Sequence, residues 1–189
     1  MDTKLKIINH LGKHTDHLFT MHELSKSIKV PYATFHRTIQ KMGDLLKIRT
    51  VGKSKILTLN TDNAVIKSYL TISSEEEMKE YIKKQQIIRK IVSELNTKDI
   101  VVLFGSYAKS SHREDSDIDL LIINNKGEKS ISFSKYELLF KKEINAIFIA
   151  KSEFMQMLKD KEENVGKQAL KEHIILNNPE KFWEAVLHG

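Results

Sequence analysis

Residues 100–106 read IVVLFGS and residues 116–122 read SDIDLLI, and these two stretches decide the fold of the second part of the chain. The apolar run Ile100–Phe104 is rich in β-branched and aromatic residues, which is typical of a buried strand. It ends at Gly105-Ser106, and a second apolar run begins directly after an acidic pair. The pattern predicts two strands, with a glycine turn leaving the first and acids at the start of the second.

The acidic pair predicts a site for a divalent cation. Side chains alternate between the two faces of a strand, so Asp117 and Asp119 share one face and Ile118 takes the other. Two carboxylates at the mouth of an apolar strand are costly unless something neutralises them. Mg²⁺ prefers such hard oxygen ligands, and it commonly bridges carboxylates and nucleotide phosphates.

The glycine turn supplies the other half of the predicted site. Gly105 allows backbone N–H groups to approach an anion closely, and the start of a short helix adds a favourable dipole. The Ser106 hydroxyl can donate a hydrogen bond to a phosphate oxygen. Together the two elements would hold a nucleoside triphosphate, with its phosphates on the turn and its metal on the aspartates.

These motifs resemble those of the nucleotidyltransferase superfamily related to DNA polymerase beta. Gly105-Ser106-Tyr107-Ala108 and the segment Ser116–Ile122 are most similar to the small, minimal members from bacteria and archaea, and the likeness covers roughly residues 74–155. The resemblance implies Mg²⁺-dependent transfer of a nucleotidyl group, usually AMP, from a triphosphate to a hydroxyl of a protein, an RNA or a small molecule. It implies that Asp117 and Asp119 are catalytic and hold two metal ions, and that Gly105 and Ser106 bind phosphates.

Further candidates lie in the segment between the two motifs. Lys109 and Arg113 either neutralise phosphate charge or are solvated charges on a short helix. Related proteins often carry a glycine where this chain has Ser110, a change that reshapes the loop after the phosphate turn.

The third acidic position of the family is altered in this chain. It lies on a later strand, here predicted at 143–149, and its best match is Asn145. An amide oxygen can still contact a metal, but an amide carries no charge and cannot act as a base. Glu143 lies on the same face and is the alternative metal ligand. The alteration leaves two interpretations open, an active enzyme and a domain that binds nucleotide without turnover.

The first part of the chain is basic. Residues 1–73 hold 12 lysine and arginine residues and 5 acids, a net of +7, and the remaining residues hold 19 and 20, a net of −1. Three short helices are predicted, the first ending at Gly12, the second capped by Thr20 with Glu23, and the third over Tyr32–Met42. Period-two alternation on both sides of residues 51–54 then predicts a β-hairpin. This order resembles a winged helix-turn-helix.

In that interpretation the basic segment binds double-stranded DNA. The Tyr32–Met42 helix would enter the major groove, and the hairpin would contact phosphates. The alternative is a protein-docking module whose lysines are merely solvated. Four nearby histidines, His10, His14, His17 and His22, are predicted to be surface residues rather than a metal site. The candidate DNA-binding residues are Tyr32, Thr34, Arg37, Gln40, Lys41, Lys47, Arg49, Lys53 and Lys55.

The expected organisation is an α+β chain with two domains. A winged helix-turn-helix occupies 1–62, a linker 63–74, and a polymerase beta-like α/β nucleotidyltransferase domain with C-terminal helices 75–189. A helix capped at Ser74 is predicted to carry one apolar stripe as far as Leu95. Trp183, in the last helix, is expected to pack in the core or between the domains rather than to stack on a base. A further helical packing stripe is predicted over Val165, Ala169, Leu170, His173 and Ile174. The 189 residues contain no cysteine, no run of about 20 apolar residues and no leader-like N-terminus, so a cytoplasmic protein is expected.

Two functions are weighed. The first is an enzyme that transfers a nucleotidyl group. The second is a DNA-binding regulator or antitoxin whose second domain senses nucleotide or is a weak catalyst. It would act beside a toxin-like protein partner, and homodimerisation is compatible with either function.

Overall fold

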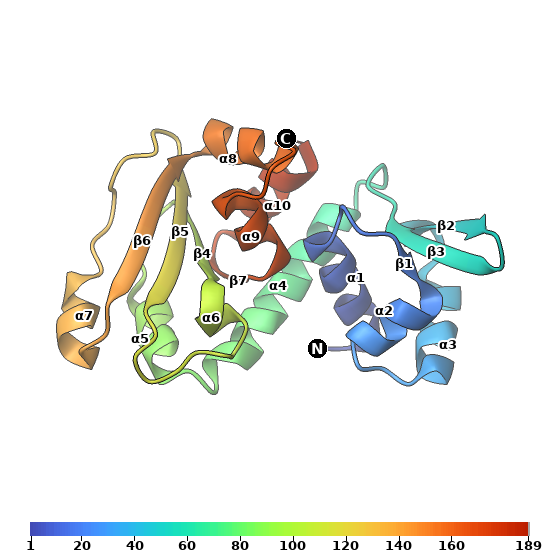
Figure 1. The fold of residues 1–189 in the computed structure, drawn as a ribbon, viewed down its shortest axis with the longest axis horizontal. Helices are drawn as coiled ribbons and strands as arrows, with labels where there is room; N and C mark the ends of the chain where they lie inside the picture. Colours follow the sequence, from blue (N-terminus) through green and yellow to red (C-terminus); the bar gives the residue numbers. More distant parts are fainter. Residues whose placement is uncertain (189) are drawn as a thin grey trace. The chain divides into compact units, whose positions relative to one another are not determined.

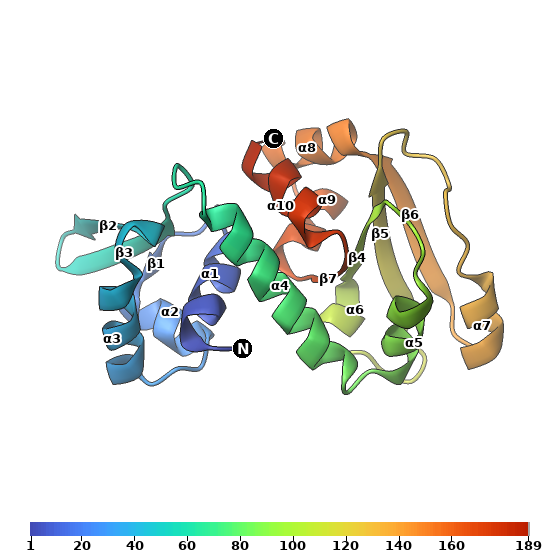
Figure 2. The same ribbon diagram turned by 180° about the vertical axis from the view of Figure 1, so that it is seen from behind.

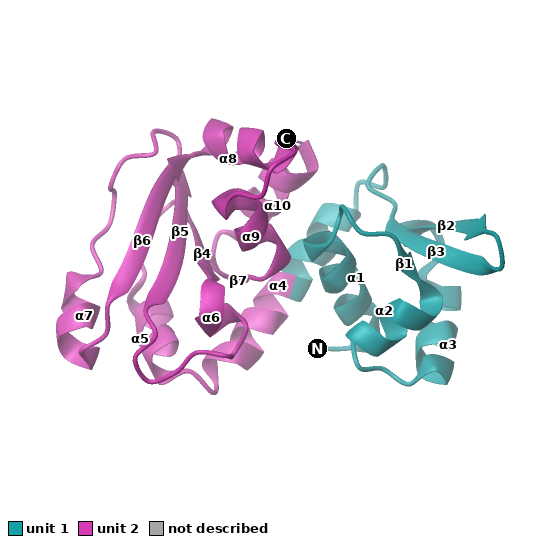
Figure 3. Cartoon of the chain, viewed as in Figure 1, with its two compact units in different colours: residues 1–73 teal, residues 74–189 magenta. Residues whose placement is uncertain are grey.

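The computed structural model describes residues 1–188, and the chain divides into two compact units, residues 1–73 and residues 74 onward (Figure 3). Each unit has its own sheet and its own helices. We call them unit 1 and unit 2. Within the described residues, no helix is long and apolar enough to cross a membrane.

Unit 1 combines short helices with a small antiparallel sheet (Figure 1). The sheet order is β1-β3-β2, and β2 and β3 form a hairpin that turns between Val51 and Ser54. The structure thus confirms the predicted helix at Tyr32–Met42 and the predicted hairpin. The elements are α1 (Thr3–Lys13), β1 (Phe19–Thr20), α2 (Met21–Ser27), α3 (Tyr32–Met42), η1 (Gly43–Leu45), β2 (Leu46–Val51) and β3 (Ser54–Leu59).

Local signals explain where these helices begin. The Thr20 side chain accepts a hydrogen bond from the Glu23 backbone, and Glu23 accepts one from the Thr20 backbone, which is the predicted capping box of α2. The prediction that α1 ends at Gly12 is wrong, because α1 continues to Lys13 and Gly12 is buried in its last turn. Burial of this helix face outweighs the low helix propensity of glycine.

Helix α4 (Ile66–Ile82) corrects the predicted start of a helix at Ser74. Most of the predicted linker at 63–74 is helical, and Ser74 lies inside the helix instead of capping its start. Ser74 is fully buried, and its hydroxyl accepts a hydrogen bond of 2.9 Å from Trp183 Nε1. The predicted stripe to Leu95 is also interrupted, since α5 (Gln86–Glu94) is a separate helix.

Unit 2 is built on a mixed sheet with the order β6-β5-β4-β7. Strand β5 pairs in parallel with β6 and antiparallel with β4, and β7 pairs antiparallel with β4. The first three strands match the predicted ones closely. The fourth was missed, because Ile174 was assigned to a helical packing stripe. The strands are β4 (Ile100–Phe104), β5 (Ile118–Asn124), β6 (Ile144–Ala150) and β7 (Ile174–Asn177).

Helices pack on both faces of this sheet (Figures 1 and 2). On one face, Ile88 and Ile91 of α5 and Tyr136 of α7 join a core with alternate strand residues such as Val101 and Leu120. Toward the other face, α9 and α10 contact β4 and α8 contacts β5 and β6. The remaining helices are α6 (Gly105–Ala108), α7 (Ser134–Phe140), α8 (Lys151–Lys159), α9 (Val165–Lys171) and α10 (Pro179–His188).

The C-terminal helix α10 completes this second core. Trp183 has no exposed surface, as expected for a core residue rather than a base-stacking platform. Its ring lies edge-on to Phe182 at 5.2 Å between centroids, and Phe182 also meets Phe154 of α8 at 5.6 Å. These aromatic contacts tie α8 and α10 together above the sheet.

Candidate functional site

The register of three neighbouring strands brings the side chains of the site together. Phe104, the last residue of β4, lies opposite Asp119 on β5, and Asp119 lies opposite Asn145 on β6. Directly opposite residues in a sheet project from the same face. The register therefore places an aromatic ring, a carboxylate and an amide side by side at one end of the sheet.

Gly105 brings the turn after β4 against this row. Its φ is +68°, a left-handed conformation that glycine adopts without strain. A Cβ atom built at this position would lie 2.2 Å from Asp119 Oδ2. The carboxylate thus occupies the space that any other side chain would need, and a glycine is required here for both reasons.

The environment of Asp119 holds its pKa above the ordinary value for aspartate. Burial is the main cause, and the negative charge of Asp117 adds to it. Asn145 acts in the opposite direction, because its Nδ2 donates a hydrogen bond of 3.3 Å to Asp119 Oδ1. Asp117 itself is exposed just before β5. A nearby cation would relieve both the burial and the repulsion.

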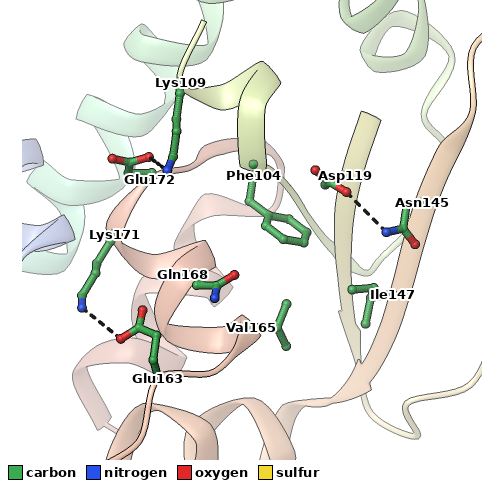
Figure 4. A pocket seen from close by; sticks show the side chains of 11 residues that line it. Phe104, Lys109, Asp119, Asn145, Ile147, Glu163, Val165, Gln168, Lys171 and Glu172 are labelled. Carbon is green, nitrogen blue, oxygen red and sulfur yellow. Dashed lines mark hydrogen bonds and ion pairs between the residues drawn. The ribbon is translucent and has the colours of Figure 1, made fainter. Parts of the chain in front are cut away.

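A cavity of about 470 Å³ opens beside Asp119 (Figure 4). Two ion pairs belong to its wall, Lys109 to Glu172 at 2.7 Å and Lys171 to Glu163 at 3.3 Å. The wall therefore contains three carboxylates and two lysines. Its lining residues are Phe104, Gly105, Lys109, Asp119, Asn145, Ile147, Glu163, Val165, Gln168, Lys171 and Glu172.

The cavity brings together only part of the predicted set. Gly105, Lys109, Asp119 and Asn145 line it. Of the described residues, Ser106, Arg113, Asp117 and Glu143 were also predicted for the site and are not part of its wall.

The loop after the turn explains where two of these residues lie. The Ser106 carbonyl accepts a hydrogen bond of 3.0 Å from the Ser111 backbone, and the Arg113 backbone donates to Ser116 Oγ at 2.8 Å. Arg113 and Glu143 are exposed. Ser110 has a φ of +55°, a left-handed conformation that glycine adopts more easily than serine.

The side chains around Asp119 offer oxygen ligands for a metal ion. Within residues 1–188, no group of three or more histidine, aspartate or glutamate side chains is arranged to hold an ion. Asp119 and Asp117 interact electrostatically, and the Asn145 amide contacts Asp119. Mg²⁺ usually takes one or two carboxylates and completes its shell with substrate phosphates and water. Asp119 beside the glycine turn, with the charge of Asp117 acting on it, fits that mode of binding.

Most of the cavity wall was not predicted from the sequence. Phe104 and Ile147 belong to strands that were predicted, but nothing in their local pattern marks them as lining residues. Val165, Gln168 and Glu172 come from the α9 region, which reaches the cavity only through the tertiary fold. The one local signal there is the cap of α9, where Asn164 Oδ1 accepts from the Lys167 backbone at 3.0 Å.

Unit 1 exposes the residues that were predicted to contact DNA. Tyr32, Thr34, Arg37, Gln40 and Lys41 are exposed on α3. Arg49, Lys53 and Lys55 are exposed on the hairpin and its turn. Lys47 differs from these, because its Nζ is 2.6 Å from Asp62 Oδ2.

The predicted surface histidines of unit 1 are only partly at the surface. His10 is half-buried, stacks on His14 at 4.4 Å between ring centroids and meets Phe19 at 5.0 Å. Burial, followed by the charges of His14, Lys13 and His17, lowers the pKa of His10 to about 4. His10 is therefore a neutral packing residue at ordinary pH.

Comparison with known proteins identifies unit 2. The model of a family described as the nucleotidyltransferase domain matches residues 86–184, which is more than half of the chain. The matched segment contains the glycine turn, the acidic pair and the cavity wall. Comparisons with curated proteins and with solved structures give no significant match.

Proposed function

Because the chain belongs to the nucleotidyltransferase domain family, we propose that unit 2 binds a nucleoside triphosphate with Mg²⁺ and transfers its nucleotidyl group to a hydroxyl, which loses its proton as pyrophosphate leaves the α-phosphorus. AMP is the expected group, and a protein, an RNA or a small molecule is the expected acceptor. The observation that carries the proposal is the apposition of Gly105 and Asp119, where a Cβ atom would lie 2.2 Å from the carboxylate oxygen.

Each part of the proposed site has a chemical task. Backbone N–H groups at Gly105 and Ser106 would bind phosphate oxygens, and Lys109 at the cavity wall would add positive charge. Asp119 and Asp117 would hold the metal, which when bound would neutralise phosphate charge and polarise the phosphoryl group attacked by the acceptor. Asn145 would keep the Asp119 carboxylate in place through its hydrogen bond.

The charge of the cavity supports a requirement for a divalent cation. Its wall carries three carboxylates against two lysines, and both lysines already pair with glutamates. A triphosphate entering alone would meet a net negative wall. Binding is therefore expected to need Mg²⁺, with the two-metal arrangement of the family as the expectation.

The test is label transfer from α-labelled triphosphates in the presence of Mg²⁺, with the protein itself, RNA and small hydroxyl compounds offered as acceptors. Asp119→Asn and Asp117→Asn should each lower transfer by about 100-fold or more, since a residue that only orients a metal ligand is already worth roughly 10–100-fold. Asp115→Asn is the matched control, because Asp115 is an exposed acid of the same loop. Transfer that is equal in all four proteins would contradict the proposal.

A second candidate function is a DNA-binding regulator whose unit 2 senses nucleotide. It is favoured by Asn145 in the third acidic position and by the exposed basic residues of α3 and the hairpin. In this proposal unit 1 is a winged helix-turn-helix that binds double-stranded DNA, and the chain acts beside a toxin-like protein partner. Triphosphate binding without any label transfer would favour this function over the first.

Gel-shift titrations at several salt concentrations test the DNA contact. Arg37→Ala should weaken duplex binding by about 1–3 kcal/mol if Arg37 reads a base edge. Arg89→Ala is the control, because Arg89 is an exposed arginine of unit 2. Equal affinity of the two variants at every salt concentration would exclude α3 as the recognition helix.

A further inference from the structure

We propose that the cavity receives the nucleobase of the bound triphosphate beside Gln168, and that the Gln168 amide selects adenine by pairing with its edge. The proposal rests on the proposed function, because it assumes that the phosphates lie at the Gly105 turn. It adds a residue that would account for the expected transfer of AMP, which neither the family match nor the acidic pair provides.

The walls of the cavity suit a flat apolar ring. Phe104, Ile147 and Val165 line it from β4, β6 and α9. Figure 4 shows these three side chains around the space that Gln168 enters. A nucleobase needs apolar contact on its faces and polar partners at its edge, which is the usual composition of a small-molecule site. A volume of about 470 Å³ also falls within the range of roughly 300–1,000 Å³ for such sites.

Helix α9 holds the backbone of Gln168 in place, and the Gln168 side chain is exposed at the cavity wall. Asn164 caps the helix and also donates from Nδ2 to the Met157 carbonyl at 2.8 Å, which ties α9 to α8. Gly166 reinforces this contact, because a Cβ atom there would lie 2.9 Å from Met157 Cβ. A side chain on an anchored helix turn can present its amide at a defined place, as a base-reading group must.

The polar lining favours a base that carries an amino group. Gln168 offers one acceptor and one donor, and this pair matches the N6 amino group and N7 of adenine. The carboxylates of Glu163 and Glu172 also line the cavity and can only accept hydrogen bonds when ionised. Lys109 and Lys171, which pair with these glutamates, also line the cavity, so the choice of a base with an amino group rests on Gln168.

The experiment compares two triphosphates that differ by one group. Dissociation constants for ATP and for purine riboside triphosphate, which lacks the N6 amino group, are measured with Mg²⁺ by calorimetry on the full chain. The unmodified protein should bind ATP about tenfold more tightly, as expected for one good hydrogen bond. Gln168→Ala and the nearly isosteric Gln168→Met should bind both compounds with equal affinity.

Gln156→Ala is the matched control, because Gln156 is an exposed glutamine of α8 outside the cavity wall. It should keep the full preference for ATP. A preference that survives in both Gln168 variants, or that is absent from the unmodified protein, overturns the base-reading role while leaving the proposed function standing. Absence of binding for every triphosphate would overturn the proposed function and this inference together.

Discussion

The two units of the chain use their charged residues in different ways. Unit 1 has a net charge of +7 and displays its arginines and lysines on the exposed side of α3 and on the hairpin. Unit 2 has a net charge of −1 and lines its cavity with charges of both signs, of which two lysines and two glutamates are held in ion pairs. The exposed charges of unit 1 add up to one electrostatic field around it. The effect of a paired charge in the cavity, in contrast, depends on the position of its single partner.

This contrast predicts different sensitivities to substitution. A surface that attracts a polyanion tolerates small displacements, because each cation adds a similar increment. A site built on strand register has no such tolerance, because Asp119, Gly105 and Asn145 meet only through the pairing of three strands. The following experiments test that difference, beginning with the largest expected effect.

Gly105→Ala should abolish Mg²⁺-dependent triphosphate binding and lower stability. The added Cβ would lie 2.2 Å from Asp119 Oδ2, and the φ of +68° is unfavourable for alanine by about 1–2 kcal/mol. We expect affinity to fall by at least about tenfold, since a carboxylate displaced from its place cannot hold the metal beside the turn. Calorimetry and thermal unfolding measure the two effects.

Gly52→Ala separates the effect of backbone strain from the effect of steric overlap with a neighbouring side chain. Gly52, in the hairpin turn of unit 1, has a similar φ of +60°, but a Cβ atom there meets nothing within 4 Å. This variant should show the stability loss alone, with triphosphate binding unchanged. If Gly105→Ala binds triphosphate as well as Gly52→Ala does, the close approach of turn and carboxylate has no functional role.

His10→Phe should make the stability of the chain less dependent on pH. The pKa of His10 falls from 6.5 to about 4 on folding, so the unfolded chain binds a proton more readily. Stability present above pH 6.5 is therefore lost as the pH falls toward 4, by about 1–2 kcal/mol once partial exposure is allowed for. Urea unfolding at pH 7 and pH 5 measures the change.

The control for His10 is His22→Phe, since His22 is an exposed histidine of the same unit. Its stability should fall between pH 7 and pH 5 as much as that of the unmodified protein. If His10→Phe and the unmodified protein have the same pH dependence of stability, a positive charge is tolerated at position 10.

Glu172→Gln should raise triphosphate affinity by about two- to fivefold. Lys109 is held by Glu172 at 2.7 Å, and both side chains are about half exposed, so the pair itself contributes little to stability. Removing the carboxylate frees Lys109 for phosphate and makes the cavity less negative. Glu184→Gln is the control. Glu184 and Lys151 form an ion pair of 3.8 Å, and neither residue lines this cavity. A decrease in affinity would mean that Glu172 positions Lys109 rather than competing for it.

Signals confined to a few neighbouring residues were sufficient for much of the fold. The capping box of Thr20 and Glu23 and the helix after Pro31 depend on contacts within one or two turns. The apolar runs of β4 and β5 are also local, and so is the alternation that places Asp117 and Asp119 on one face. Of the four predicted site residues that line the cavity, Asp119 and Asn145 lie on strands that were assigned correctly, and Gly105 and Lys109 belong to the turn and short helix after β4.

Features that depend on distant partners were missed. Ile174 was read as part of a helical stripe, but it pairs with Leu103, far earlier in the chain, and only that pairing makes it a strand residue. Ser74 resembled a helix cap because Glu77 follows it three positions later. Its actual partner is Trp183, more than a hundred positions away, and no local pattern indicates that contact. Gln168 and Glu172 have no local pattern that marks them, because the packing of α9 against β4 brings them to the cavity.

Helix α4 has a practical consequence for anyone who wishes to prepare the two units separately. The boundary between them falls between Ser73 and Ser74, in the middle of a continuous helix rather than in a loop. A fragment beginning at Ser74 would leave the partner of Trp183 in a frayed first turn, where its hydrogen bond is easily lost. Protease digestion should accordingly spare this junction, and a shortened clone of unit 2 should start upstream of Ile66.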